Sequence, residues 1–180
     1  MINESRRPAS VFLGLGSNLG DRRANLREAA RRIEAAGARI VRESSIYETE
    51  PVGYLDQPWF LNQVIEARVE RDGSLQREDE AEALLAVLLR IEEEMGRRRV
   101  IEGGPRVIDI DLLLYGSLII ARSTEIIVPH PRMHLRRFVL EPMREIAPDL
   151  LHPSIGKTFR ELLDELDDPS IVRPYVEHDA

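Results

Sequence analysis

Two carboxylates lie in the middle of an otherwise apolar segment of the sequence. In RVIDIDLLLYG, residues 106–116, Asp109 and Asp111 alternate with isoleucine and leucine. The segment is typical of a strand that is buried on at least one face, and side chains two residues apart on a strand share a face. Two like charges so close together need a cation. Magnesium is suitable, because carboxylate oxygens and substrate phosphates together bind this hard ion.

Arginine supplies almost all of the positive charge, since Lys157 is the only lysine among 25 basic residues. The arginines cluster at Arg97, Arg98, Arg99 and Arg106, and again at Arg132, Arg136 and Arg137. A guanidinium binds two phosphate oxygens at once, so clustered arginine beside paired carboxylates indicates phosphoryl transfer. Two alternatives stay open at this point. In the first, one aspartate of the pair only caps or turns the strand, or pairs with an arginine. In the second, the arginine clusters are ordinary solvated surface.

Nucleotide binding in this chain has to depend on arginine and metal. The segment GLGSNLG, residues 14–20, lacks the third glycine spacing of a dinucleotide fingerprint, and no GxxxxGK[ST] loop is present.

The apolar periodicity predicts the elements that position these residues. The expected strands are 11–15, 38–50, 60–70, 106–116 and a short return strand at 118–120. Four helices are expected. The first is capped by Asn18 or Asp21 and ends at Gly37, and the others are 78–95, 137–147 and 159–166. The inner face of helix 78–95 is expected to carry Leu84, Leu85, Leu88, Leu89 and Ile91. The core order β-α-β-β-α-β predicts an α+β, ferredoxin-like sandwich with helices packed on an antiparallel sheet and a C-terminal helical extension.

The bulk composition fits an ordinary globular protein of one domain. The chain has 180 residues, 43% apolar and 32% charged, and its net charge of −7 argues against nucleic-acid or membrane-surface binding. It has no cysteine and no apolar run long enough for a membrane span. We expect residues 1–10 to form a flexible arm, 11–180 to form a single domain, and the protein to be a cytoplasmic monomer.

Four segments, in order, resemble the 6-hydroxymethyl-7,8-dihydropterin pyrophosphokinase family of folate biosynthesis. They are LGLGSNLGDRRANL, SSIYETEPVGYLDQPWFLNQV, GRRRVIEGGPRVIDIDLLLYG and VPHPRMHLRRFVLEPMREIAP. The resemblance covers about residues 11–165. It implies an α+β fold and the transfer of pyrophosphate from ATP to the dihydropterin, which gives the pterin diphosphate and AMP. ATP is then a co-substrate, and two magnesium ions are the cofactors.

On the nucleotide side, the resemblance implies that Asp109 and Asp111 hold the two magnesium ions. Arg97 and Arg99 match arginines of a loop that closes over ATP, and with Arg106 they are the expected catalytic residues. The ATP-binding residues that it implies are Glu92, Arg97, Arg99, Arg106, His130 and Arg136. Among these, Glu92 is expected near the adenosine, whereas Arg106, His130 and Arg136 are expected on the phosphates.

On the pterin side, Asn62 matches the amide that reads the hydrogen-bonding edge of the ring. Phe60 and Phe138 match two aromatic residues that sandwich the ring, although each taken alone is more typical of a core residue. Thr49 and Gly53 lie where the family's main chain completes the pocket.

The sequence also departs from the family pattern at three positions. Gly103 stands where members often have tryptophan, and Glu102 where they often have a basic residue. Leu89 replaces a polar residue near the adenosine. Arg132 and Arg137 match no family role and are expected on the surface.

Two other classes of function compete with this interpretation. A different two-metal enzyme, such as a nucleotidyltransferase or a hydrolase, uses the same pair of aspartates but has no use for Asn62 and two aromatic residues. A non-catalytic ferredoxin-like module that binds a small ligand has no need of the D-x-D pair.

Overall fold

The computed structural model describes residues 7–97, 103–121 and 126–176, so Arg98, Arg99 and Glu102 lie outside the described residues. The strands are β1 (Ala9–Ser17), β2 (Ala38–Glu43), β3 (Tyr47–Thr49), β4 (Phe60–Val69), β5 (Asp109–Tyr115), β6 (Ile120–Ala121), β7 (Ile127–Val128) and β8 (Val172–Pro174). The helices are α1 (Arg22–Ala35), α2 (Arg77–Glu94), the 3-10 turn η2 (Met133–Leu135), α3 (Arg137–Ile146) and α4 (Phe159–Asp164).

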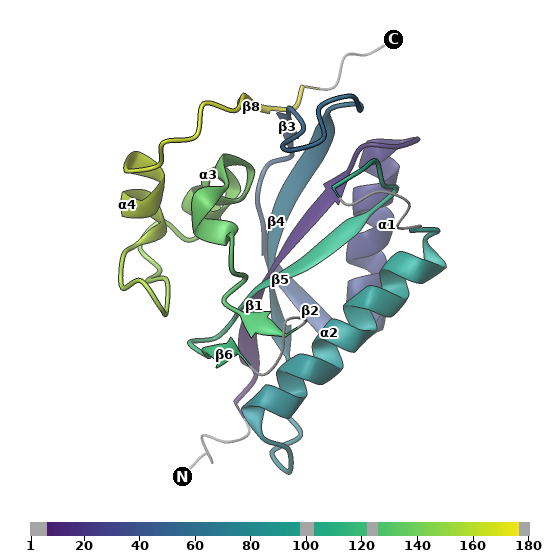
Figure 1. The fold of residues 1–180 in the computed structure, drawn as a ribbon. Coiled ribbons are helices and arrows are strands. Elements are labelled where there is room, and N and C mark those ends of the chain that lie inside the picture. Colours follow the sequence, from purple (N-terminus) through teal and green to yellow (C-terminus); the bar gives the residue numbers. More distant parts are fainter. Residues whose placement is uncertain (1–6, 98–102, 122–125, 177–180) are drawn as a thin grey trace.

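The main sheet is antiparallel and has the order β5-β1-β4-β3-β8, with β2 also paired to β4. Helices α1 and α2 cover one face, and α3 and α4 lie on the other side (Figure 1). The four core strands thus follow the ferredoxin-like order, and the α+β prediction with a C-terminal helical extension is confirmed.

Alternation along the strands divides the core in two. The face under α1 and α2 is mostly apolar, with Leu13, Leu15, Ile65 and Ile110 buried among helix residues. The opposite face is apolar only where α3 and α4 cover it. Beyond α3 this face carries glycine, asparagine and aspartate, so the sheet leaves one region open for polar chemistry.

Several expected boundaries differ from the observed ones. The expected strand 38–50 is two strands on the same edge of β4, because the Ser44 hydroxyl accepts a hydrogen bond from Val64 N (3.0 Å) where the ladder is interrupted. Strand β1 begins at Ala9 rather than residue 11, so the last two residues of the expected arm belong to the sheet. The return strand pairs with β7 in a separate two-stranded sheet, and Leu89 is 39% exposed rather than inside.

Asp21, not Asn18, caps α1, since its carboxylate accepts a hydrogen bond from Ala24 N (2.9 Å). Gly37 follows the end of this helix with φ +100°, a conformation that favours glycine. Asn18 is therefore free to bond elsewhere. Among the described residues, no helix is both long and apolar enough to cross a membrane.

Candidate active site

The candidate site lies on the open face of the sheet, where β5, β1 and β4 run side by side. Gly16 of β1 is registered between Asn62 of β4 and Asp109 of β5, and Gly14 is registered opposite Asp111. A Cβ atom on Gly16 would lie only 2.7 Å from Asn62 Oδ1, so glycine is required for this close approach. The two glycines keep the floor of the site flat between amide and carboxylates.

Above this floor is a cavity of about 890 Å³. It is lined by residues predicted for both substrates: Thr49, Gly53, Phe60, Asn62, Arg97, Arg106, Asp109, Asp111, His130, Arg136 and Phe138. These residues come from β3, β4, β5 and α3 and from the loops between elements. One cavity therefore brings together groups suited to phosphates and groups suited to a planar heterocycle.

The aspartate pair is balanced by nearby basic side chains. Asp109 forms ion pairs with Arg97 (2.7 Å) and Arg106 (2.8 Å), whereas Arg136 Nη1 and His130 Nε2 lie 3.8 and 3.9 Å from Asp111. Desolvation, followed by the charge of Asp109, raises the pKa of Asp111 to about 7. The alternative in which an aspartate pairs with arginine is thus realised for Asp109, while the cation nearest to Asp111 among the described residues, Arg136, is a longer contact at 3.8 Å.

The pair meets the requirement for magnesium but not for a metal held by protein alone. Within the described ranges, no group of three or more histidine, aspartate or glutamate residues is arranged to hold a metal ion. Magnesium is commonly bound by one or two carboxylates together with waters and substrate phosphates. Two carboxylates facing an arginine-lined cavity match that donor set.

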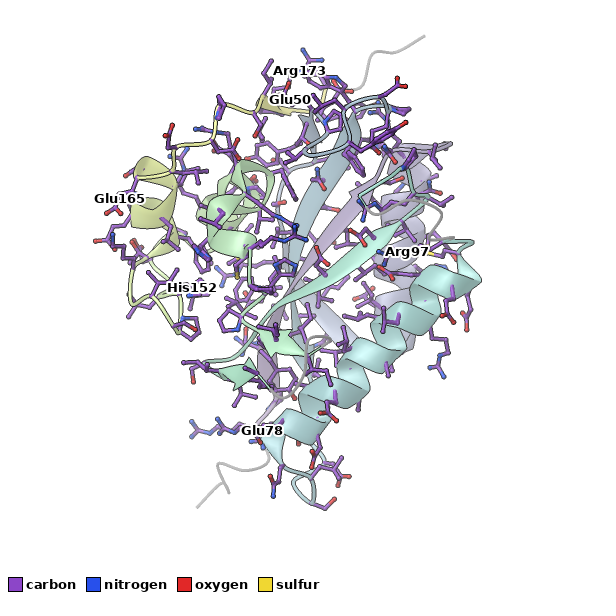
Figure 2. The ribbon with its side chains drawn as sticks, in the orientation of Figure 1. Glu50, Glu78, Arg97, His152, Glu165 and Arg173 are labelled. Carbon is purple, nitrogen blue, oxygen red and sulfur yellow. The ribbon has the colours of Figure 1, made fainter. Side chains whose placement is uncertain are left out.

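Glu92 lies beneath this region, at the end of α2. It is 2% exposed and is not among the residues that line the cavity. Its Oε1 accepts a hydrogen bond from Ile110 N (2.5 Å), and its Oε2 pairs with Arg97. Burial raises its pKa. Glu92 thus fixes the start of β5 and the Arg97 side chain, which Figure 2 shows beside the C-terminal end of α2.

His130 is held in one tautomer. Its Nδ1 accepts a hydrogen bond from Arg132 N (3.2 Å), so in the neutral ring the proton is on Nε2, the nitrogen nearer Asp111. Burial, with the nearby charges of Arg136 and Arg132, lowers the pKa of His130 to about 4. At neutral pH this residue is therefore an uncharged N–H donor that faces the carboxylate pair.

Two of the predicted pterin residues, Asn62 and Thr49, are joined by a direct side-chain hydrogen bond. Asn62 Nδ2 donates to Thr49 Oγ1 (2.7 Å), and both residues are buried. The rings of Phe60 and Phe138 are half-buried in the cavity wall, with guanidinium carbons 5.6 Å (Arg106) and 5.4 Å (Arg136) from the ring centres. Both aromatic residues therefore face the cavity beside arginines, and Phe138 also packs against the core under α3.

Residues 12–148 match the family model described as "7,8-dihydro-6-hydroxymethylpterin-pyrophosphokinase (HPPK)". The chain belongs to this family. A 2-amino-4-hydroxy-6-hydroxymethyldihydropteridine pyrophosphokinase of Methylorubrum extorquens is 42% identical over 91% of this chain and 97% of its own length. One from Bacillus subtilis is 43% identical over 76% of this chain and 77% of its own length.

Two further matches are to proteins of which this chain spans less than half the length. The match to the folic acid synthesis protein fol1 of Pneumocystis carinii is 38% identical and covers 90% of this chain but 21% of that protein. The wild-type HPPK-DHPS of Plasmodium falciparum has a TM-score of 0.67 at 15% identity, over 91% of this chain and 45% of that one. This second likeness supports the fold alone.

Two features of the site were missed by the sequence analysis. Asn18, which we considered only as a helix cap, is 2% exposed and links two loops. Its Oδ1 accepts from Arg106 N (2.8 Å) and its Nδ2 donates to Gln57 Oε1 (3.0 Å), while Gln57 Nε2 donates to Gly103 O (2.9 Å). Arg132, expected only on the surface, is exposed and also lines the cavity. A polar residue directly after a buried strand was the available signal for Asn18.

Proposed function

We propose that this chain transfers the pyrophosphoryl group of ATP to 6-hydroxymethyl-7,8-dihydropterin in folate biosynthesis, giving the pterin diphosphate and AMP. The observation that carries the proposal is the single cavity in which Asp109 and Asp111 lie on the same sheet face as Asn62. Membership of the HPPK family and the names of its close relatives support the same reaction.

In this proposal Asp109 and Asp111 hold two magnesium ions together with the phosphates of ATP. When bound, the ions neutralise phosphate charge and polarise the β-phosphoryl group. Arg97 and Arg106 pair with Asp109 in this structure. As the nucleotide binds, their guanidinium groups change partner from Asp109 to phosphate oxygens. The exchange replaces one set of charge-assisted hydrogen bonds with another, so its net cost is small.

The remaining nucleotide contacts extend from this centre. Arg136 and the Nε2–H of His130 are placed to donate to phosphate oxygens, and Arg99 completes the set of catalytic arginines. Glu92 acts on the adenosine side through Arg97, whose position it fixes. These donors stabilise the charge that develops on the transferred group, and positioning supplies most of the catalysis.

The pterin enters between Phe60 and Phe138, and its polar edge meets Asn62, with Thr49 and the backbone at Gly53 closing the pocket. Its hydroxymethyl oxygen then attacks the β-phosphorus. An oxygen–phosphorus bond forms there, the bond from the β-phosphorus to the oxygen it shares with the α-phosphorus breaks, and that oxygen leaves with AMP. The hydroxyl proton is released as the new bond forms.

The proposal includes a monomeric enzyme whose catalytic domain begins with β1 at Ala9. A cytoplasmic location, where ATP and magnesium are supplied, belongs to the same proposal.

The decisive experiment is product analysis. The protein is incubated with ATP, magnesium and 6-hydroxymethyl-7,8-dihydropterin, and the nucleotides are separated. AMP formed in equal amount with a pterin diphosphate, and only when the pterin is present, is the expected result. ADP as the main product indicates an ordinary kinase, and AMP made equally without pterin indicates a hydrolase. Either result contradicts the proposal.

A further inference from the structure

The C-terminal segment, residues 167–175, runs from the end of α4 across the top of α3 to the edge of the main sheet (Figure 1). We call it the C-terminal strap. None of its residues is among those that line the cavity. Its contacts nevertheless fall on three separate pieces of the cavity wall.

The first contact is at the N-terminus of α3. No side chain of Arg136, the residue at the cap position, closes this helix. Asp168 does so from the strap, because its Oδ2 accepts a hydrogen bond from Arg137 N (2.9 Å) and its backbone oxygen accepts one from Arg137 Nε (2.9 Å). Phe138, one of the two proposed pterin-stacking residues, is the next residue of that helix.

The second contact is a β-ladder. Strand β8 pairs with β3, and Val172 is registered opposite Thr49, whose hydroxyl binds Asn62. Two further hydrogen bonds continue this contact at Glu50, since Glu50 N donates to Ile171 O (3.2 Å) and Ile171 N donates to the Glu50 side chain at Oε1 (2.8 Å). The strap thereby fixes the backbone on which the Asn62 partner sits.

The third contact is made by Arg173. Its guanidinium binds the Glu48 carboxylate (2.7 Å) and lies 5.0 Å from the centre of the Trp59 ring. Trp59 directly precedes Phe60, the other proposed stacking residue. Figure 2 shows Arg173 beside Glu50 at the edge of the sheet, away from Arg97 on the nucleotide side.

We propose that the C-terminal strap positions the pterin half of the site, with Asp168 and Arg173 as positioning residues. Each contact ends on, or next to, a residue proposed to touch the pterin: Phe138, Thr49 and Phe60. The contacts described for the strap do not include Asp109, Asp111, Arg97 or Arg106, but Asp168 binds Arg137, which directly follows Arg136 of the nucleotide half. Losing the Arg173 contacts therefore loosens the acceptor pocket and leaves phosphate binding as it was. The inference rests on the proposed function.

The test compares Arg173→Ala and Asp168→Ala with the control Arg160→Ala. Arg160 also pairs with a carboxylate near the C-terminus, Asp149 (3.0 Å), but from α4 and away from β3. In the full chain, Arg173→Ala is expected to raise the KM for the pterin about three- to tenfold, the scale of an exposed ion pair plus a cation–π contact, and to leave the KM for ATP within about twofold. Asp168→Ala, whose contact also borders Arg136, should raise the KM for both substrates. The control variant should stay within about twofold of the wild type for both.

Tryptophan fluorescence gives a second, ligand-free readout. Trp59 is the only tryptophan in the sequence, so its emission reports on the guanidinium beside it. Arg173→Ala should shift or change this emission, whereas Arg160→Ala should not. A structural role without positioning would lower the melting temperature and raise both KM values alike.

The outcomes separate the two claims. If wild-type protein makes no pterin-dependent AMP, the proposed function fails and this inference fails with it. If the wild type is active but the strap variants keep a normal pterin KM, or Arg173→Ala loses pterin and ATP affinity in parallel, the strap inference alone is overturned. A selective rise in the pterin KM supports it.

Discussion

The two halves of the candidate site are built in different ways. On the pterin side, Asn62 and Thr49 sit on neighbouring strands, are buried and bind each other directly. On the phosphate side, Asp109 at the start of β5 is paired with Arg97 and Arg106, which come from outside the strands. The first half is neutral and fixed by the sheet, whereas the second is charged and occupied by its own counterions.

This difference indicates how each half binds its ligand. In the proposed function, the neutral amide of Asn62 is already held in place, so binding the pterin ring costs little ordering of the protein. The proposal also requires the arginines and aspartates to exchange partners when phosphate and magnesium bind, so that half is completed only by its ligands. Variants on the phosphate side should therefore act on turnover, and variants on the pterin side on affinity.

The largest expected effect belongs to the aspartates. Asp109→Asn and Asp111→Asn should each lower the turnover number on the order of 10³-fold or more, because magnesium loses a charged ligand while the fold is kept. AMP formation at saturating magnesium measures the loss, and circular dichroism checks the fold. Asp149→Asn, a change at an exposed carboxylate on the surface, is the matched control. Near-normal turnover in either site variant would contradict the metal assignment.

Asn62→Ala is expected to act on the other half. The dissociation constant for the pterin should rise about 10- to 100-fold, because the polar edge of the ring is then buried without its partner. Affinity for ATP should be unchanged. Titration calorimetry with each ligand measures both, and Asn25→Ala, which removes an amide bonded to Leu19 O (2.9 Å), is the control. A lower melting temperature with unchanged pterin affinity would make Asn62 a structural residue only.

Substituting the two glycines of the floor, Gly14 and Gly16, should have a smaller effect on pterin affinity than Asn62→Ala and tests the position of Asn62 directly. Gly16→Ala would place a Cβ 2.7 Å from Asn62 Oδ1, whereas Gly14→Ala would meet only the Leu113 side chain at 3.5 Å, an ordinary contact. Displacing the amide by a few tenths of an ångström should weaken pterin binding about tenfold for Gly16→Ala. Gly14→Ala should leave pterin affinity within about twofold. Equal effects of the two changes would show that the fixed position of Asn62 is unimportant.

Much of the fold was predictable because periodicity and helix ends are local signals. The order of strands and helices follows from alternation in residues 38–50, from short apolar segments such as 60–70 and from apolar spacing in α2. Strand β8 was not predicted, since Val172–Pro174 is short, itself ends in a proline and lies in a segment without a periodic pattern. Its pairing with β3 depends on where α4 delivers the chain, which is a tertiary property.

The site was predictable to the extent that residue type determines role. Asp109 and Asp111 stood out because charge in an apolar strand is costly, and the pterin residues came from the family resemblance. The hydrogen bonds that Asn18 makes to two loops could not be predicted, although its position after a buried strand could be noticed. Its partners Arg106 and Gln57 are distant in sequence and meet only when the loops fold together. The position of Glu92 beneath the cavity likewise depends on its bond to Ile110 N.

The smallest expected effect concerns stability without magnesium, and it is best seen against pH. Asp111 has an ordinary pKa of 3.8, raised to about 7 in the folded chain by desolvation and by Asp109. The folded state therefore retains a proton that the unfolded chain has lost between these values. Ionised Asp111 accordingly costs stability progressively as pH rises from about 4 to about 7, and the full cost persists above that range.

Asp111→Asn carries no such cost, so its melting temperature relative to the wild type should increase between pH 5 and pH 8 in the presence of a chelator. Each kcal/mol corresponds to about 2–4 °C for a chain of this size. Keeping the series above pH 5 avoids His130, whose pKa is lowered to about 4. The substitution also weakens the contact between residue 111 and Arg136. A pH-independent loss of stability from that contact shifts the whole curve of melting-temperature difference against pH without changing its slope. A flat difference across this range would mean that the phosphate half already neutralises Asp111 without metal, and that the two halves differ less than their geometry indicates.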